Sequence, residues 1–157
     1  MSEKNPIRVF VTHVFEEGDD YLRIFEFLES DDRFYYLNVS KPENVPSDGK
    51  IESIKDELIT QIKASEAMIV LPEAYERNAD LVSYMMDVAE ANSIGMIGVR
   101  PFGGMAETPK EIVERSGDPI DWNARQLIDS LKLSARGEDT QRWEVIDFPG
   151  FEPDETT

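Results

Sequence analysis

The chain has 157 residues, of which 33 are acidic and 16 are basic, so its formal net charge is −17 at pH 7. This length is typical of one domain that buries a core of its own. The lack of cysteine excludes a disulfide scaffold, a thiol nucleophile and a cysteine zinc site. The large negative charge disfavours nucleic acid as a partner, because two polyanions repel each other.

The sequence predicts a soluble, cytoplasmic protein with no membrane partner. No stretch reaches the ~18 apolar residues that a membrane-spanning helix requires. The first six residues lack the cationic and then apolar plan of a signal peptide, and they lead directly into an apolar segment.

Five segments are predicted to form strands. They are short, rich in β-branched or other apolar residues, and followed by turn signals. The segments cover residues 7–13, 34–39, 67–71, 95–99 and 119–121. The last of these is expected to be a minimal edge strand, whereas the first and third are apolar enough to lie in the middle of a sheet.

Helical patterns lie between these strands. The first begins at a cap formed by Asp19 or Asp20 and has an apolar face that includes Tyr21, Phe25 and Leu28. A loop with two prolines over residues 41–50 precedes the second helix, for which Ser47 or Asp48 is the expected cap. The apolar spacing of this second helix is that of an amphipathic helix and comes from Ile51, Ile54, Leu58 and Ile62.

Three further helices are predicted in the second half. Residues 72–80 are expected to be a loop, and the helix over 80–92 carries Leu81, Met85 and Val88 on one stripe. A capping box between Thr108 and Glu111, with Pro109 at the first helical position, indicates a short helix that ends at Gly117. The last helix is predicted over 123–136.

This alternation predicts one flavodoxin-like α/β domain over residues 1–136, a three-layer sandwich. Its five-stranded, mostly parallel sheet would carry helices on both faces. Residues 137–157 are predicted to form a C-terminal arm and tail. Since ligands of such sheets bind beyond the carboxyl ends of the strands, a site is expected among the loops at 12–18, 40–49, 72–80 and 100–108.

The usual motifs of nucleotide and hydrolase sites do not occur in these loops. No Gly-x-Gly-x-x-Gly follows the first strand, and the chain has no Walker loop and no Gly-x-Ser-x-Gly elbow. With a single histidine, His13, a nitrogen-rich metal site is not expected. The acidic cluster over residues 16–20 is better explained by the helix that begins there than by a bound cation.

Several side chains in the loops suit a ligand. A neutral His13 at the end of the first strand would bind a ribose or a phosphate, although hydrogen bonding to nearby backbone explains it equally well. The aromatic rings of Phe15 and Tyr75 would stack on adenine or nicotinamide, or pack down over the strand ends instead.

The order of these segments resembles a known family. Residues 9–13, which close the first strand, resemble the opening motif of TIR-like domains, and the likeness continues through residues 51–71, 81–84, 87–89 and 95–99. It is similar above all to the bacterial TIR-like group that includes the NAD-processing subunit of Thoeris antiphage systems. The resemblance covers about residues 7–132.

This resemblance implies cleavage of the bond between nicotinamide and ribose in NAD, with NAD as a substrate and no cofactor. Such chemistry requires a carboxylate that stabilises an oxocarbenium-like centre and an aromatic wall for the base. The family places a glutamate directly after an aromatic residue in the helix that follows the third strand. In this chain the aromatic is Tyr84, but the next residue is Met85, which carries no charge.

Met85 leaves three interpretations open: the step is lost, the chain is an inactivated variant, or the register is shifted. It shares the stripe of Leu81 and Val88, so a core methionine is the simplest explanation. Asp87 is predicted to face away from the pocket. The catalytic residue is therefore unassigned, and the substrate-binding residues that the resemblance implies are Thr12, His13, Phe15, Tyr75 and Tyr84.

The leading prediction is a TIR-like signalling or antiphage-defence domain with an ancestral NAD glycohydrolase chemistry, whose activity in this chain Met85 leaves open. A non-enzymatic TIR-like interaction module is the main alternative. Such a module would self-associate or bind another signalling protein through residues 41–49 and 143–151. A small nucleotide-binding or nucleoside-processing α/β protein is a third hypothesis.

Overall fold

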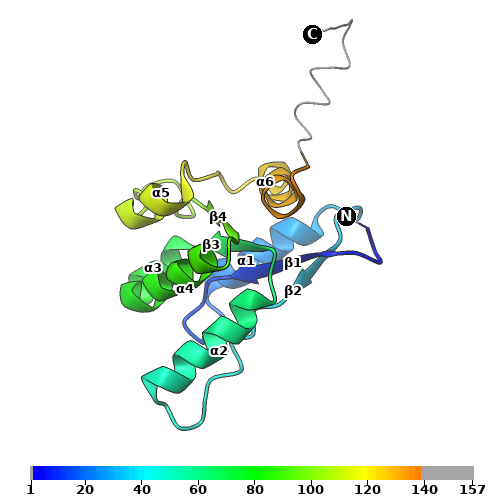
Figure 1. Cartoon of the computed structure of the whole chain (residues 1–157). Helices are drawn as coiled ribbons and strands as arrows, with labels where there is room; N and C mark the ends of the chain where they lie inside the picture. Colours follow the sequence, from blue (N-terminus) through cyan, green and yellow to red (C-terminus); the bar gives the residue numbers. More distant parts are fainter. Residues whose placement is uncertain (1, 139–157) are drawn as a thin grey trace, which may run out of the picture.

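A computed structural model describes residues 2–138 of the chain. Four parallel strands form one sheet in the order β2-β1-β3-β4 (Figure 1). The strands are β1 (Ile7–Val11), β2 (Tyr36–Asn38), β3 (Ala67–Val70) and β4 (Gly95–Gly98). The helices are α1 (Asp19–Glu29), α2 (Ile51–Lys63), α3 (Pro72–Arg77), α4 (Ala79–Ala91), α5 (Lys110–Ser116) and α6 (Ala124–Arg136).

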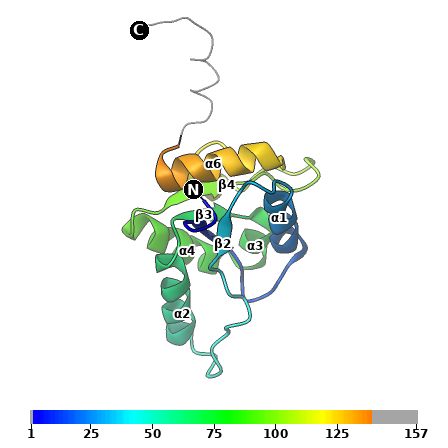
Figure 2. The same cartoon turned by 90° about the vertical axis from the view of Figure 1, so that its right-hand side faces the viewer.

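The alternation of side chains along β1 divides the core into two layers. Ile7, Val9 and Val11 point to one face of the sheet and pack with the apolar sides of α1 and α6. Phe10 points to the other face, where the buried residues come from α2, α3, α4 and α5. Helices therefore cover both faces of the sheet (Figure 2), and the prediction of a mixed α/β domain with a parallel sheet is confirmed.

The prediction of five strands is wrong, because the described residues form four. The segment around residue 120 pairs with the sheet only through one parallel bridge, between Val99 and Ile120. Two backbone hydrogen bonds of 2.9 Å, from Ile120 N–H to the Gly98 carbonyl and from Arg100 N–H to the Ile120 carbonyl, make this bridge. The ladder goes no further, because the next acceptor beyond β4, the Arg100 carbonyl, binds the Trp122 indole N–H at 2.8 Å, so the segment stays a single bridged residue.

Ion pairs tie the two central strands to the last helix at the amino edge of the sheet. The Glu66 carboxylate, just before β3, accepts hydrogen bonds from the backbone and the side chain of Arg8 on β1, each 3.1 Å long. It also pairs with the Arg136 guanidinium at the end of α6. These donors lower the pKa of Glu66 to about 2, since hydrogen bonds to the charged form favour it.

Residues 72–80, predicted to be a loop, form the helix α3 and the start of α4 instead. Pro72 occupies the first turn of α3, where its missing N–H costs nothing. Asn78 ends α3 and begins α4, and its side-chain oxygen accepts the Leu81 N–H at 3.1 Å. Pro72 and Asn78, which indicated a loop, are the first residue and the C-cap of a short helix.

The expected caps of three helices are also wrong. The N-cap of α2 is Lys50, with no side-chain cap, instead of Ser47 or Asp48. The N-cap of α1 is Gly18, and the carboxylate of Glu73 on α3 accepts the Asp20 N–H at 3.1 Å. Pro109 is the N-cap of α5, where no side chain caps the helix, so Glu111 makes no capping box. At α1 and at α5, a carboxylate forms hydrogen bonds with a distant element of the fold instead of capping its own helix.

The proposed contact arm over residues 143–151 lies outside the described residues. Within residues 2–138, no helix combines the length and the apolar character that crossing a membrane would require.

Candidate functional site

The strand ends at β1 and β3 are joined by Thr12. This side chain is fully buried, and its hydroxyl oxygen accepts the Leu71 N–H at 2.9 Å. The position is the switch point of the sheet, where chain connections leave β1 and β3 in opposite directions and where ligands of this fold class bind. Thr12 uses its acceptor to hold the two strand ends together.

His13 is buried beside Thr12, and both of its ring nitrogens are occupied. Nδ1 accepts the Phe15 N–H at 3.0 Å, which leaves Nε2 as the donor to the side-chain oxygen of Gln61 at 2.9 Å. Burial lowers the pKa of His13 below its usual value, because desolvation disfavours the imidazolium. His13 is therefore a neutral imidazole whose hydrogen bonds fix the loop after β1.

Phe15 completes this turn in an unusual backbone conformation. Its φ of 62° lies in the left-handed region, which residues other than glycine adopt rarely. Its ring meets the imidazole of His13 edge-on, with the ring centroids 5.0 Å apart. The hydrogen bond and the ring contact to the same histidine hold the strained conformation in place.

Gln61 is the residue that sequence reasoning missed. It is buried on α2, where its side-chain oxygen accepts both the His13 ring N–H and the Lys41 N–H, the latter at 2.8 Å. Its amide donates to the Lys41 carbonyl at 3.1 Å and to Glu57 at 2.8 Å. The only signal in the sequence was a polar residue on the apolar stripe of a helix, between Leu58 and Ile62.

The space at the switch point is a cavity of about 10 Å³. It lies between the β1–α1 loop and α3 and is lined by Thr12, His13, Val14, Glu16, Gly18, Tyr21, Leu71, Glu73, Ala74 and Arg77. An ion pair between Glu16 and Arg77 joins the two walls. This volume suits one water molecule, whereas pockets for organic ligands usually enclose ~300–1,000 Å³.

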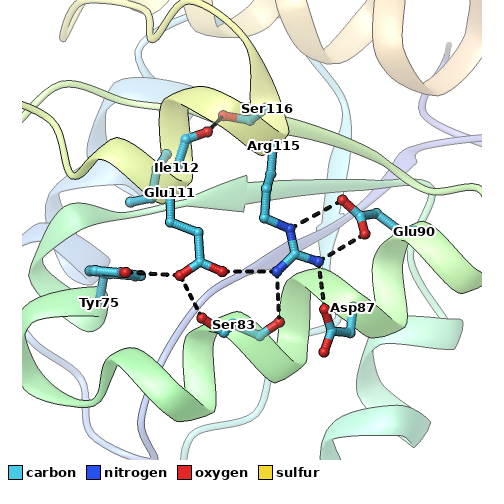
Figure 3. Close-up of polar contacts among 8 residues, drawn as sticks. All are labelled: Tyr75, Ser83, Asp87, Glu90, Glu111, Ile112, Arg115 and Ser116. Carbon is cyan, nitrogen blue, oxygen red and sulfur yellow. Dashed lines mark hydrogen bonds and ion pairs between the residues drawn. The ribbon is translucent and has the colours of Figure 1, made fainter.

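Tyr75 is turned away from the switch point, toward α5. Its hydroxyl donates to Glu111 at 2.8 Å, and the Ser83 hydroxyl donates to the same oxygen at 2.7 Å (Figure 3). These donors and Arg115 lower the pKa of Glu111. Tyr75 therefore helps to fasten α5 onto α3 and α4.

Arg115 is the centre of that polar cluster. It donates to Glu111 at 3.0 Å, to Asp87 at 2.6 Å and to both oxygens of Glu90 at 2.8 and 3.1 Å. One cation thus neutralises part of the charge on three carboxylates from two helices (Figure 3). These contacts join α4 to α5, and the arrangement is that of a structural ion-pair network.

Met85 and Tyr84 lie on different sides of α4. Met85 is fully buried in the core layer that α2, α4 and α5 share with the sheet, as its stripe with Leu81 and Val88 predicts. Tyr84 is half-buried and lies under the Lys55 ammonium of α2, whose nitrogen is 4.8 Å from the ring centroid.

A groove between α2 and α4 receives Tyr84. Its volume is about 550 Å³, and it is lined by Ile51, Lys55, Asn78, Asp80, Leu81, Ser83, Tyr84 and Asp87. Asp87 lies three residues after Tyr84, and since residues three apart share a face of a helix, both line this groove. Two carboxylates and one ammonium thus surround an aromatic ring at a groove of ligand size.

The five predicted binding residues do not converge on one place. Thr12, His13 and Phe15 lie together at the switch point. Tyr75 belongs to the cluster around Arg115, and Tyr84 belongs to the groove between α2 and α4. Among residues 2–138, no group of three or more His, Cys, Asp or Glu side chains has the arrangement of a metal site.

Comparison with known proteins adds no assignment. No protein-family model matches this chain, and no curated protein matches it.

Proposed function

We propose that this chain is a TIR-like signalling or defence domain that has lost NAD cleavage and acts by binding another protein. The observation that carries the proposal is the burial of Met85 in the core. At the position where the TIR-like resemblance implies a catalytic glutamate, the chain has an apolar side chain that no substrate reaches.

The switch point supports the same conclusion. Oxocarbenium chemistry needs a carboxylate and room for the nicotinamide ribose. Within the described residues this region offers a cavity of about 10 Å³, and the polar atoms of Thr12 and His13 bond to the fold. The order of the parallel strands is compatible with a flavodoxin-like fold, and the ligand position usual in such folds is filled by protein.

We also propose a cytoplasmic location. The chain has no cysteine, which agrees with a reducing compartment. The high negative charge favours a protein that stays dispersed until a partner of complementary charge binds.

Release of nicotinamide from NAD tests the proposal. The wild-type chain, at low and high concentration and with a crowding agent that promotes assembly, is expected to release none above the buffer control. Release that rises in proportion to protein concentration, and that is lost in a His13→Ala variant with an intact fold, would contradict it.

A further inference from the structure

The apolar stripe of α2 extends beyond the core that it serves. Leu58 and Ile62, in its second half, are buried, whereas Ile51 in the first turn is 57% exposed. The first half of α2 projects past the rest of the fold (Figures 1 and 2). Ile51 lines the groove between α2 and α4 together with Leu81 and Tyr84. Leu81 and Tyr84 pack with the core, so Ile51 is the exposed apolar side chain that the groove offers to a partner.

The same groove already binds one cation, which belongs to the chain itself. The Lys55 ammonium lies 4.8 Å from the centroid of the Tyr84 ring, within the range at which the negative face of an aromatic ring attracts a cation. The carboxylate of Asp80 is exposed at the rim. Asp87, on the same face of α4, is also exposed, although Arg115 bonds one of its oxygens.

This chemistry selects among the possible occupants. Two carboxylates at the rim repel the phosphates of a nucleotide, and a second copy of a chain with a charge of −17 is repelled as a whole. A lysine or arginine is attracted by the carboxylates and by the ring together. A leucine-like side chain beside it would cover the exposed Ile51.

We propose that the groove between α2 and α4 binds a basic amphipathic segment of a partner protein, with one of its cationic side chains replacing Lys55 over Tyr84. The proposal rests on the proposed function in one respect only, that the domain works by binding a protein. It names the surface and the chemistry of the partner.

A synthetic helical peptide with lysine on one face and leucine on the other is the probe, and fluorescence anisotropy measures its affinity. The most specific expectation concerns Lys55, because this side chain competes with the peptide. Lys55→Gln should tighten binding several-fold. Lys63→Gln makes the same change in net charge at the exposed last residue of α2 and is expected to have a much smaller effect.

Substitutions of the ring and the rim provide the second test. Tyr84→Leu should weaken binding about tenfold, whereas Tyr84→Phe keeps the aromatic face and most of the affinity. Asp80→Asn should weaken binding more than Asp32→Asn, which removes an equal charge from the exposed loop before β2. Equal thermal unfolding of the variants shows that the fold is intact.

Three results would overturn the proposal. The peptide does not bind the wild-type chain, or it binds all the variants equally, as general attraction to an acidic protein would produce. The third is concentration-dependent self-association that Tyr84→Leu abolishes, since the occupant would then be a second copy. None of these depends on nicotinamide release, so failure of this proposal and failure of the proposed function are separate outcomes.

Discussion

The switch point and the groove between α2 and α4 both contain polar side chains, but the fold uses them differently. At the switch point, Thr12 and His13 bond to backbone groups and to Gln61, and a cavity of about 10 Å³ remains. In the groove, Asp80 and Lys55 flank the ring of Tyr84 around a volume of about 550 Å³.

The difference shows that the position of a residue at the carboxyl edge of a sheet does not establish a binding role. Buried polar groups are retained when the fold satisfies their hydrogen bonds, and at the switch point it does so. In the groove, charged groups face solvent and keep their capacity to bind. Substitutions in the first region should therefore change stability, and those in the second should change binding.

The largest expected effect distinguishes two neighbouring positions of α4. Met85→Glu places a carboxyl group in the core and should lower the free energy of unfolding by ~3–5 kcal/mol. Tyr84→Glu, at the groove, should cost much less. Chemical denaturation of both variants measures the difference, with Met85→Leu as the volume-conserving control. Equal losses for Met85→Glu and Tyr84→Glu would show that Met85 is not in the core.

Removal of Arg115 should have the next largest effect. Arg115→Met leaves the carboxylates of Asp87, Glu90 and Glu111 without their shared cation, and we expect a loss of about 2 kcal/mol. Added salt should reduce this loss, because it screens the repulsion among the carboxylates. Denaturation at low and high salt provides the measurement. A loss that salt leaves unchanged would indicate that packing of the arginine stem, and not its charge, stabilises α5.

Thr12→Val tests whether the switch point is structural. The substitution keeps the shape of the side chain but leaves the Leu71 N–H without its acceptor, which should cost ~1–3 kcal/mol. Affinity for the basic peptide should not change. The unfolding midpoint and the peptide titration are measured on the same preparation. An unaltered midpoint would show that the Thr12 hydroxyl does not stabilise the switch point.

The smallest expected effect is the pH dependence from His13. Its pKa in the folded chain lies below the ordinary histidine value of 6.5 because the ring is buried, so in the range between the two pKa values the unfolded chain binds more protons. Neutral, buried His13 therefore contributes to the free energy of unfolding. This contribution is complete above the pKa of His13 in the unfolded chain, and it is lost as the pH falls through that value toward the pKa in the folded chain. From about pH 7.5 to about pH 5.5, the midpoint of urea unfolding should therefore decrease more for the wild-type chain than for the His13→Asn variant.

Sequence patterns predicted the elements whose periodicity follows from burial. The alternation of Ile7, Val9 and Val11 against Phe10 placed β1 at the centre of the sheet, and the stripe with Leu81 and Val88 placed Met85 in the core. Asn123 was included at the start of the last helix and caps it instead, with its side chain accepting the Gln126 N–H. The strand β1, the apolar stripe of α4 and the cap of α6 all depend on residues that are close together in the sequence.

The features that sequence patterns missed depend on partners far along the chain. Glu73 caps α1 across 53 residues, and Gln61 meets His13 across 48. Glu111 has the spacing of a capping box, but tertiary partners on α3 and α4 bind it instead. The groove around Tyr84 forms where α2 packs against α4, so no local sequence motif predicts it.

One proton NMR titration with NAD tests the central claim most directly. His13 is the only histidine in the chain, so its ring protons give a single reporter at the switch point, and the same spectra show any free nicotinamide. We predict that saturating NAD leaves the His13 signals unshifted and yields no nicotinamide. A saturable shift of those signals, accompanied by the appearance of nicotinamide, would contradict the account.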